Sequence, residues 1–244
     1  MIEVFADKKA LSRGAAKKFL QIAQEAVAKN GRFLVALSGG STPQGLFRQL
    51  SQPPFNDLLP WQQTHVFWGD ERLVPPDDAG SNYKQAHDVL LSKVNIPPQQ
   101  IYRALGEATP ATAVTDYTNK LKGLAEPNRE WPQFDLILLG MGSDGHTASL
   151  FPGPIPTIEK TNAIITVTAE YDGRPAHRIT FTPLVINDAR HVIFLVVGEN
   201  KREALTAVRL GSPNPEKWPA QRIQPQPGSL TWLVDAAAAR NFGK

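Results

Sequence analysis

The sequence predicts one three-layer α/β/α sandwich over residues 1–244, built on a mostly parallel sheet. Apolar runs of strand length alternate with segments whose apolar residues recur at helical spacing. The strand segments are apolar throughout, which is typical of parallel strands covered by helices on both faces. No internal repeat or low-complexity linker divides the chain, and its length suits one large α/β domain.

Caps and turn residues delimit the elements that we expect in the first half of the chain. In chain order these are a helix over 9–29, a strand at Phe33–Leu37, a helix over Gln44–Gln52, a strand at Thr64–Trp68 and a helix over Asn82–Lys93. Pro43 suits the first turn of the second helix, with Ser41 or Thr42 as its N-cap. Ser81 is the expected cap of the third helix, after a polar loop from Gly69 to Gly80.

The second half repeats the alternation, with shorter elements in its middle. We expect, in order, a helix over Thr112–Ala125, strands at Phe134–Leu139, Ala163–Thr168 and Arg178–Phe181, helical turns over Pro183–Ala189, a strand at His191–Val197, a helix over Arg202–Arg209, a strand at Leu230–Val234 and an alanine-rich final helix. A helix is also expected to begin close to His146. Residues 211–228 contain five prolines and predict an irregular loop within the domain.

Composition excludes several functional classes. The absence of cysteine excludes disulfides, zinc–thiolate sites and thiol nucleophiles. No stretch approaches the roughly 20 apolar residues of a membrane span, and the N-terminus does not resemble a signal peptide. The net charge is +3, with 26 basic residues scattered among 23 acidic ones, so we expect neither a nucleic-acid-binding patch nor membrane attachment. The expected location is the cytoplasm.

Four polar turns follow predicted strands at the same end. They are Ser38–Pro43, Gly69–Arg72, Gly140–Thr147 and Gly198–Lys201. Ligands of open parallel sheets bind outside the carboxyl ends of the strands, so the topology should gather these turns into one site.

The turn Ser38–Pro43 has the parts of an anion-binding loop, namely backbone N–H groups, hydroxyls and a helix N-terminus. It lacks the Gly-Lys-Ser/Thr ending of a nucleotide P-loop. An ordinary capped turn is the alternative. Arg72, Lys201 and Arg178 could complete a phosphate site, although a single basic residue is more often a solvated surface charge.

Asp144 and His146 lie two residues apart in a glycine-rich turn after a strand. Histidine is suited to proton transfer near neutral pH, so His146 is the candidate general base. Asp144 could orient it, bind a sugar hydroxyl or cap a helix, and a purely structural role of His146 is the alternative. Zinc could be bound by Asp144, His146 and Asp70, but no third nitrogen or sulfur ligand is evident, so we expect no metal. Asp70 and Glu71 are adjacent and should point in different directions.

Four segments together resemble the 6-phosphogluconolactonases of the glucosamine-6-phosphate isomerase/6-phosphogluconolactonase superfamily. They are Ala36–Pro43, Trp68–Arg72 with Ser81–Tyr83, Gly140–Pro152 and Val197–Lys201. The resemblance implies a modified Rossmann-like fold of the sugar-phosphate isomerase and lactonase type. It also implies hydrolysis of 6-phospho-D-glucono-1,5-lactone to 6-phospho-D-gluconate in the oxidative pentose phosphate pathway, without a cofactor.

Roles carried over by position make His146 the base and place Asp70, Arg72, Arg178 and Lys201 in the substrate pocket, with the Gly39–Gly40 turn close to it. From the residue chemistry we further expect Asp144 and Arg72 to act in catalysis and Ser41 and Thr42 to bind the substrate. A glucosamine-6-phosphate deaminase is the first alternative, but Phe151 stands where that enzyme's motif has a glutamate. A non-catalytic sugar-phosphate sensor is the second. The expected partner is a phosphorylated sugar lactone, and the expected state is a monomer, with an oligomer left open.

Overall fold

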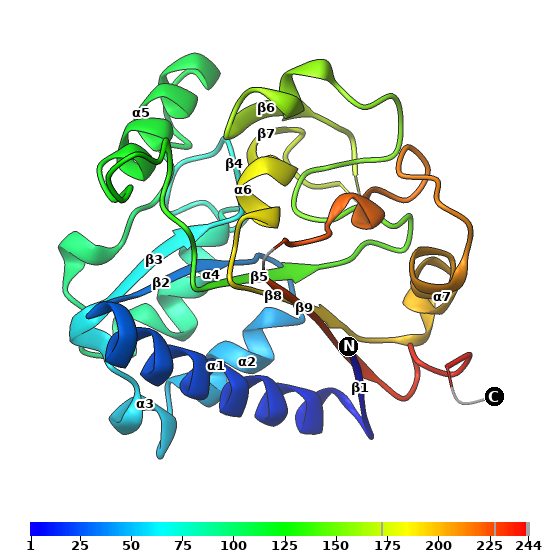
Figure 1. Cartoon of the computed structure of the whole chain (residues 1–244), viewed down its shortest axis with the longest axis horizontal. Helices are drawn as coiled ribbons and strands as arrows, with labels where there is room; N and C mark the ends of the chain where they lie inside the picture. Colours follow the sequence, from blue (N-terminus) through cyan, green and yellow to red (C-terminus); the bar gives the residue numbers. More distant parts are fainter. Residues whose placement is uncertain (172, 227, 243–244) are drawn as a thin grey trace.

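The computed structural model describes residues 1–171, 173–226 and 228–242. Its centre is a six-stranded sheet in the order β1-β9-β8-β5-β2-β3, and all neighbouring strands are parallel. The strands are β1 (Ile2–Phe5), β2 (Phe33–Leu37), β3 (Thr64–Trp68), β5 (Leu136–Gly140), β8 (His191–Val196) and β9 (Ser229–Asp235). The predicted parallel sheet between helical layers is confirmed (Figure 1).

Apolar side chains on both faces explain why the central strands are buried. All five residues of β2 are buried, and the last five of β8 are buried as well. Two apolar clusters lie on opposite faces of the sheet. One includes Phe19 and Phe47, and the other includes Tyr117 and Phe181.

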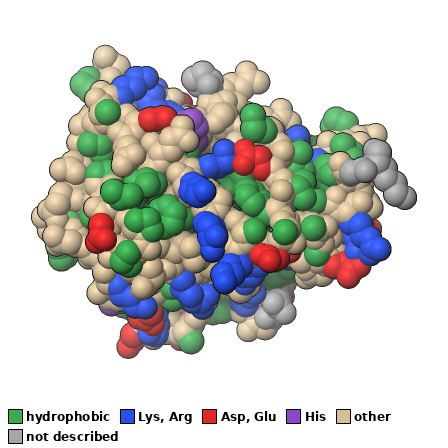
Figure 2. Space-filling view, turned by 90° about the horizontal axis from the view of Figure 1, so that it is seen from below, with side chains coloured by type: hydrophobic (Ala, Val, Ile, Leu, Met, Phe, Trp, Pro, Cys, Tyr) green, Lys and Arg blue, Asp and Glu red, His purple; other side chains and the backbone are tan. Residues whose placement is uncertain are grey.

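The helices cover both faces of this sheet. They are α1 (Lys8–Asn30), α2 (Pro43–Leu50), α3 (Phe55–Leu58), α4 (Asn82–Val89), α5 (Pro110–Lys122), α6 (Pro183–Asn187) and α7 (Arg202–Leu210). The Asp7 carboxylate caps α1 by accepting from the Ala10 N–H at 2.7 Å. Exposed basic side chains on the outer side of α1 contribute to the blue band in Figure 2.

A second, three-stranded antiparallel sheet lies above the first, and the sequence did not predict it as a sheet. Its order is β4 (Asp70–Arg72), β7 (His177–Phe181) and β6 (Ile164–Thr168). The two longer strands were predicted from their apolar residues. The charged triplet Asp70–Arg72 was predicted as a turn, but it pairs with β7 and all three residues are buried.

Two local predictions were wrong, and a third, the N-cap of α2, is confirmed in position. No helix begins near His146, because residues 141–153 form an irregular loop that includes positive φ at Gly145, Ala148 and Gly153. The alanine-rich end forms turns after β9 instead of a helix. Thr42 is at the N-cap position of α2, but its side chain makes no capping hydrogen bond.

The predicted loop over 211–228 is largely irregular in its described part, with a short 3₁₀ helix at Pro219–Arg222, and Pro227 lies outside the described residues. Within the described chain, no helix is both long and apolar enough to span a membrane.

Candidate active site

A pocket of about 140 Å³ lies at the carboxyl ends of the parallel strands, beside the second sheet. Of the residues that the structure describes, the lining includes nine of the ten predicted site residues: Gly39, Gly40, Ser41, Thr42, Asp70, Arg72, His146, Arg178 and Lys201. Asp144 lies behind His146. The topology therefore gathers the four predicted turns at one site, together with Arg178 from β7.

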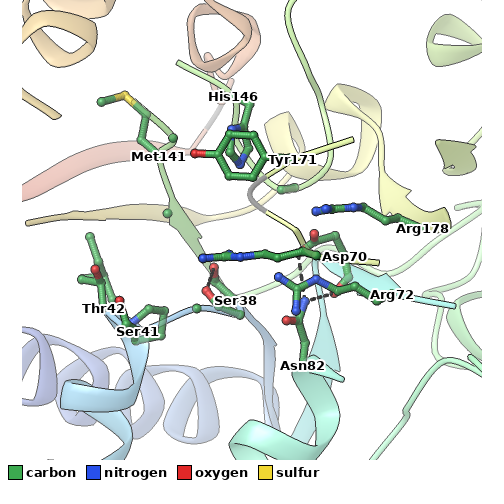
Figure 3. A pocket seen from close by; sticks show the side chains of 18 of the residues that line it. Ser38, Ser41, Thr42, Asp70, Arg72, Asn82, Met141, His146, Tyr171 and Arg178 are labelled. Carbon is green, nitrogen blue, oxygen red and sulfur yellow. Dashed lines mark hydrogen bonds between the residues drawn. The ribbon is translucent and has the colours of Figure 1, made fainter. Parts of the chain in front are cut away.

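The candidate base His146 and the buried arginine Arg178 lie on different sides of this pocket. Figure 3 shows His146 and Tyr171 on one side and Arg178 on another. Ser41 and Thr42 lie across the pocket from Arg178, at the start of α2. A ligand that fills the pocket would therefore meet the imidazole and several groups that bind anions.

His146 is held by a short hydrogen bond. Its Nδ1 lies 2.7 Å from Asp144 Oδ1, and the same carboxylate oxygen accepts from the His146 backbone N–H at 3.2 Å. The His146 side chain is 14% exposed. Because a carboxylate accepts a proton donor, Nδ1 carries the hydrogen and Nε2 is left with its lone pair. This arrangement suits a general base.

The charge state of Asp144 fits this role. Burial opposes ionisation of its carboxyl, but the hydrogen bond to His146, together with the positive charge that His146 carries when it is protonated, lowers the pKa of Asp144 below its usual value. Asp144 is therefore an ionised acceptor at neutral pH.

Aromatic rings and a close glycine fix the plane of the His146 ring. Phe151 stacks on it with ring centroids 4.7 Å apart, and Tyr171 meets it edge-on at 4.5 Å. A Cβ on Gly142 would lie 2.1 Å from His146 Nδ1, so only glycine fits there without displacing the imidazole. The glycine-rich turn thus makes room for the hydrogen-bonded pair.

Arg72 and Arg178 face each other across the β4–β7 pair and are 5% and 2% exposed. Arg72 Nη1 donates to the Gly80 carbonyl at 2.5 Å, and Arg178 Nε donates to the Pro175 carbonyl at 3.1 Å. In the described part of the chain, Arg72 Nε and Arg178 Nη2 are buried without a hydrogen-bond partner. Two adjacent buried guanidinium groups with unused donors are arranged to bind an anion.

The electrostatics around Arg178 support this reading. Burial lowers the pKa of Arg178, and although Asp70 raises it, the positive charges of Arg72 and Arg174 lower it further. The pocket also contains Lys201, which ends the short helix at Glu199–Lys201. Among the described residues that line the pocket, the cationic side chains of Arg72, Arg174, Arg178 and Lys201 outnumber the single carboxylate of Asp70, a lining that suits an anionic ligand.

Asp70 links the pocket to the framework behind it. Its Oδ2 accepts from Ser149 Oγ at 2.7 Å, and its Oδ1 lies 3.4 Å from Asn82 Nδ2. Asn82 also fills the space at Gly39, where a Cβ would lie 1.8 Å from Asn82 Oδ1. Gly39 therefore lets the strand-to-helix turn pack closely against α4.

Glu71 turns away from the pocket, as adjacent residues on a strand should. Its carboxylate accepts backbone N–H groups of Arg72, Asn82 and Tyr83, each at 2.7 Å. Burial raises the pKa of Glu71, and these three hydrogen bonds act in the opposite direction. Its role is structural, because it joins β4 to the start of α4.

Sequence reasoning assigned no role to Tyr171, Arg174 or Asn82, although all three line the pocket. Tyr171 and Arg174 lie between β6 and β7, in a segment that no predicted turn included. The one indication in the sequence was that Arg174 lies close to Arg178, a residue already predicted for the site. Asn82 belonged to a segment of the resemblance, and only its contacts with Asp70 reveal its place at the site.

The backbone of the first turn only partly matches the predicted anion-binding loop. The Gly40 N–H donates to Gln85 Oε1 at 3.3 Å, so this amide already has a partner. As for a metal, the described residues contain no group of three or more His, Asp or Glu placed to bind one.

Comparisons with known proteins show what this chain is similar to. The family model "Glucosamine-6-phosphate isomerases/6-phosphogluconolactonase" matches residues 6–232. A 6-phosphogluconolactonase of Synechocystis sp. is 42% identical over 89% of this chain and 88% of its own length. One from Nostoc sp. is also 42% identical, over 97% and 96%. The solved structure of 6-phosphogluconolactonase from Trypanosoma brucei is 29% identical, covers 100% of this chain and 98% of its own, and superposes with a TM-score of 0.86.

Proposed function

Because the chain belongs to the glucosamine-6-phosphate isomerase/6-phosphogluconolactonase family, we propose that it hydrolyses 6-phospho-D-glucono-1,5-lactone to 6-phospho-D-gluconate. This is a step of the oxidative pentose phosphate pathway, and the curated relatives carry the name of the enzyme that performs it. The observation that carries the proposal is the pairing of His146 with Asp144 at the edge of a cationic pocket.

The positively charged residues of the pocket can bind both negatively charged groups of the reacting substrate. The substrate has a phosphate at one end and develops negative charge on the carbonyl oxygen at the other. We assign Lys201 and Arg178, with the hydroxyls of Ser41 and Thr42, to the phosphate. Arg72 is the better donor for the developing oxyanion, because the Gly40 amide already donates to a side chain.

His146 would then act first as a base and afterwards as an acid. Its Nε2 takes a proton from water while the water oxygen bonds to C1 of the lactone. The tetrahedral oxyanion collapses, the bond from C1 to the ring oxygen breaks, and the imidazolium returns its proton to that oxygen. The product acid ionises in solution. General base catalysis of this kind contributes about 100- to 10,000-fold.

Aminosugar deamination is the second candidate within the same family. Its distinguishing requirement, by the resemblance described above, is a glutamate where this chain has Phe151. The Phe151 ring instead stacks on His146, so an apolar surface stands there. This contact favours the lactonase.

The first test is a lactonase assay with His146→Ala beside the wild type. Freshly generated lactone is supplied, and 6-phosphogluconate release is followed through a coupled dehydrogenase. We expect kcat to fall by at least about 100-fold in the variant, with KM little changed because the phosphate ligands remain.

Three other results would redirect the proposal. Wild-type turnover by the variant would remove His146 as the base. Ammonia release from glucosamine 6-phosphate would favour the deaminase. Tight binding of 6-phosphogluconate by a folded wild-type protein without turnover of either substrate would favour the sensor.

A further inference from the structure

The loop that holds His146 is neither helix nor strand, and its internal hydrogen bonds are those of tight turns. Its internal backbone bonds include Gly142 N–H to His146 O at 2.8 Å and Leu150 N–H to Thr147 O at 2.9 Å. Ala148 has a φ of 48°, a conformation that non-glycine residues rarely adopt. A loop of this kind keeps one conformation only when neighbouring segments hold it.

The proline-rich segment over 214–222 provides much of that support. The Ala220 N–H donates to the Gly145 carbonyl at 2.9 Å, and the Gly153 N–H donates to the Glu216 carbonyl at 2.8 Å. Trp218 packs on the backbone of the loop, because a Cβ on Gly145 would lie 2.6 Å from its ring. The segment therefore contacts the loop on both sides of His146.

A buried ion pair ties these segments together. Arg222 Nη1 lies 3.1 Å from Glu159 Oε1, and both side chains are 5% exposed. The same guanidinium donates through Nε to the Pro215 carbonyl at 2.9 Å and through Nη2 to the Phe151 carbonyl at 3.4 Å. The Arg222 side chain thus joins the proline-rich segment, the short helix at Thr157–Lys160 and the catalytic loop.

Phe151 connects Arg222 to the His146 imidazole, because its carbonyl accepts from Arg222 and its ring contacts His146. Its ring stacks on His146 on one side, and the Arg178 guanidinium lies 5.2 Å from its centroid. A shift of the Phe151 backbone would therefore tilt or release the His146 ring. Because the base must lie within hydrogen-bond reach of water in the correct direction, such a tilt would slow the reaction.

We propose that Arg222, with its counter-ion Glu159, is a positioning residue that fixes Phe151 and, through it, the orientation of the His146 imidazole. The inference rests on the proposed lactone hydrolysis. A buried ion pair is a weak source of stability, since desolvation of the two charges offsets their attraction. Burial accordingly lowers the pKa of Arg222 and raises that of Glu159, each against the pull of its partner.

The test replaces both partners at once, because removing one would leave a buried unpaired charge and endanger folding. Arg222→Met/Glu159→Leu fills the space of the ion pair with apolar side chains of similar size. It removes the guanidinium donors to the Phe151 and Pro215 carbonyls. We expect kcat to fall by about 10- to 100-fold and KM to change less than twofold. Arg222→Lys with Glu159 retained should recover part of the loss.

The matched control is Arg103→Met/Glu107→Leu, which removes an exposed Arg–Glu pair with a separation of 2.7 Å. It should leave kcat unchanged. Wild-type kcat in Arg222→Met/Glu159→Leu would overturn the proposal, and so would equal losses in the control pair.

A second readout does not depend on turnover. NMR signals of the His146 ring, assigned by their loss in His146→Asn, should shift in Arg222→Met/Glu159→Leu and stay in place in the control pair. If the wild type fails to hydrolyse the lactone, the proposed function fails, yet the ring signals still test the positioning. Unshifted signals in a folded double variant would overturn it.

Discussion

The hydrogen bond from His146 Nδ1 to Asp144 determines which imidazole nitrogen faces the pocket. An amide in place of the carboxylate can donate as well as accept. It would then allow Nδ1 to become the acceptor and Nε2 to carry the proton, which is the wrong tautomer for a base. The Asp144 carboxylate thus matters through its charge as well as its position.

We therefore expect Asp144→Asn to lower kcat by at least about tenfold, and by up to about 10⁴-fold if the tautomer reverses completely. The KM should change little, because Asp144 lies behind His146 and outside the pocket lining. Steady-state kinetics measure both constants. Asp116→Asn, which breaks a surface pair with Lys120, is the control. A kcat equal to that of the wild type would show that Asp144 does not select the tautomer.

At the scale of elements, the β4–β7 pair places two positively charged side chains opposite each other, which lowers the stability of the fold. Its register sets Arg72 opposite Arg178, and the Arg178 side chain is 2% exposed. Opposed like charges destabilise a sheet, and a buried donor without a partner adds a desolvation cost. An anionic ligand would compensate both effects, so the empty site should be less stable than the occupied one.

Arg178→Met should accordingly raise the melting temperature of the ligand-free protein by about 2–4 °C, which corresponds to about 1 kcal/mol at this chain length. It should also weaken stabilisation by inorganic phosphate, because one of the proposed ligands is lost. Thermal unfolding with and without phosphate measures both effects. Arg13→Met, exposed on α1, should change neither. A lower melting temperature with intact phosphate stabilisation would contradict this account.

Element type was predictable where burial left a simple pattern in the sequence. The apolar runs that became β2, β3, β5 and β8 were recognised because both faces of these strands are covered. The edge strand Ile2–Phe5 was missed, since it is short and only partly buried. Asp70–Arg72 was missed because three charged residues do not resemble a strand. Their burial depends on partners far along the chain, such as Ser149 and Thr180.

For the molecule as a whole, the site was more predictable than its supports. Strand order brings the carboxyl-end turns together, so topology, together with the chemistry of the residues and the family resemblance, located the residues in those turns. Among the residues that complete or brace the site, Tyr171 and Arg174 lie in the segment between β6 and β7, and Arg222 ends a single 3₁₀ turn in the proline-rich loop. Their positions depend on long-range contacts, which no local pattern encodes. The alanine-rich end was predicted as a helix because alanine has high helix propensity. The segment is too short for propensity alone to make it helical.

Acid sensitivity of the whole fold should depend on two histidines at the starts of parallel strands. Burial lowers the pKa of His65 in β3, and the charge of Arg32 lowers it further. Burial is also the largest influence on His191 in β8 and lowers its pKa, although Glu25 and Asp135 act in the opposite direction. Both imidazoles therefore bind a proton less readily in the folded chain than in the unfolded chain.

The sign of the effect follows from proton binding. Below the usual histidine pKa of about 6.5, the unfolded chain takes up protons that the folded chain does not, so the free energy of unfolding falls as the pH falls. The loss ends once the folded imidazoles are protonated too. Denaturant unfolding between pH 7.5 and 5, at roughly half-unit steps, should show this decline, and His65→Gln/His191→Gln should flatten it. His87→Gln, at an exposed position on α4, should keep the wild-type slope. An unchanged slope in the double variant would mean that other groups govern acid sensitivity.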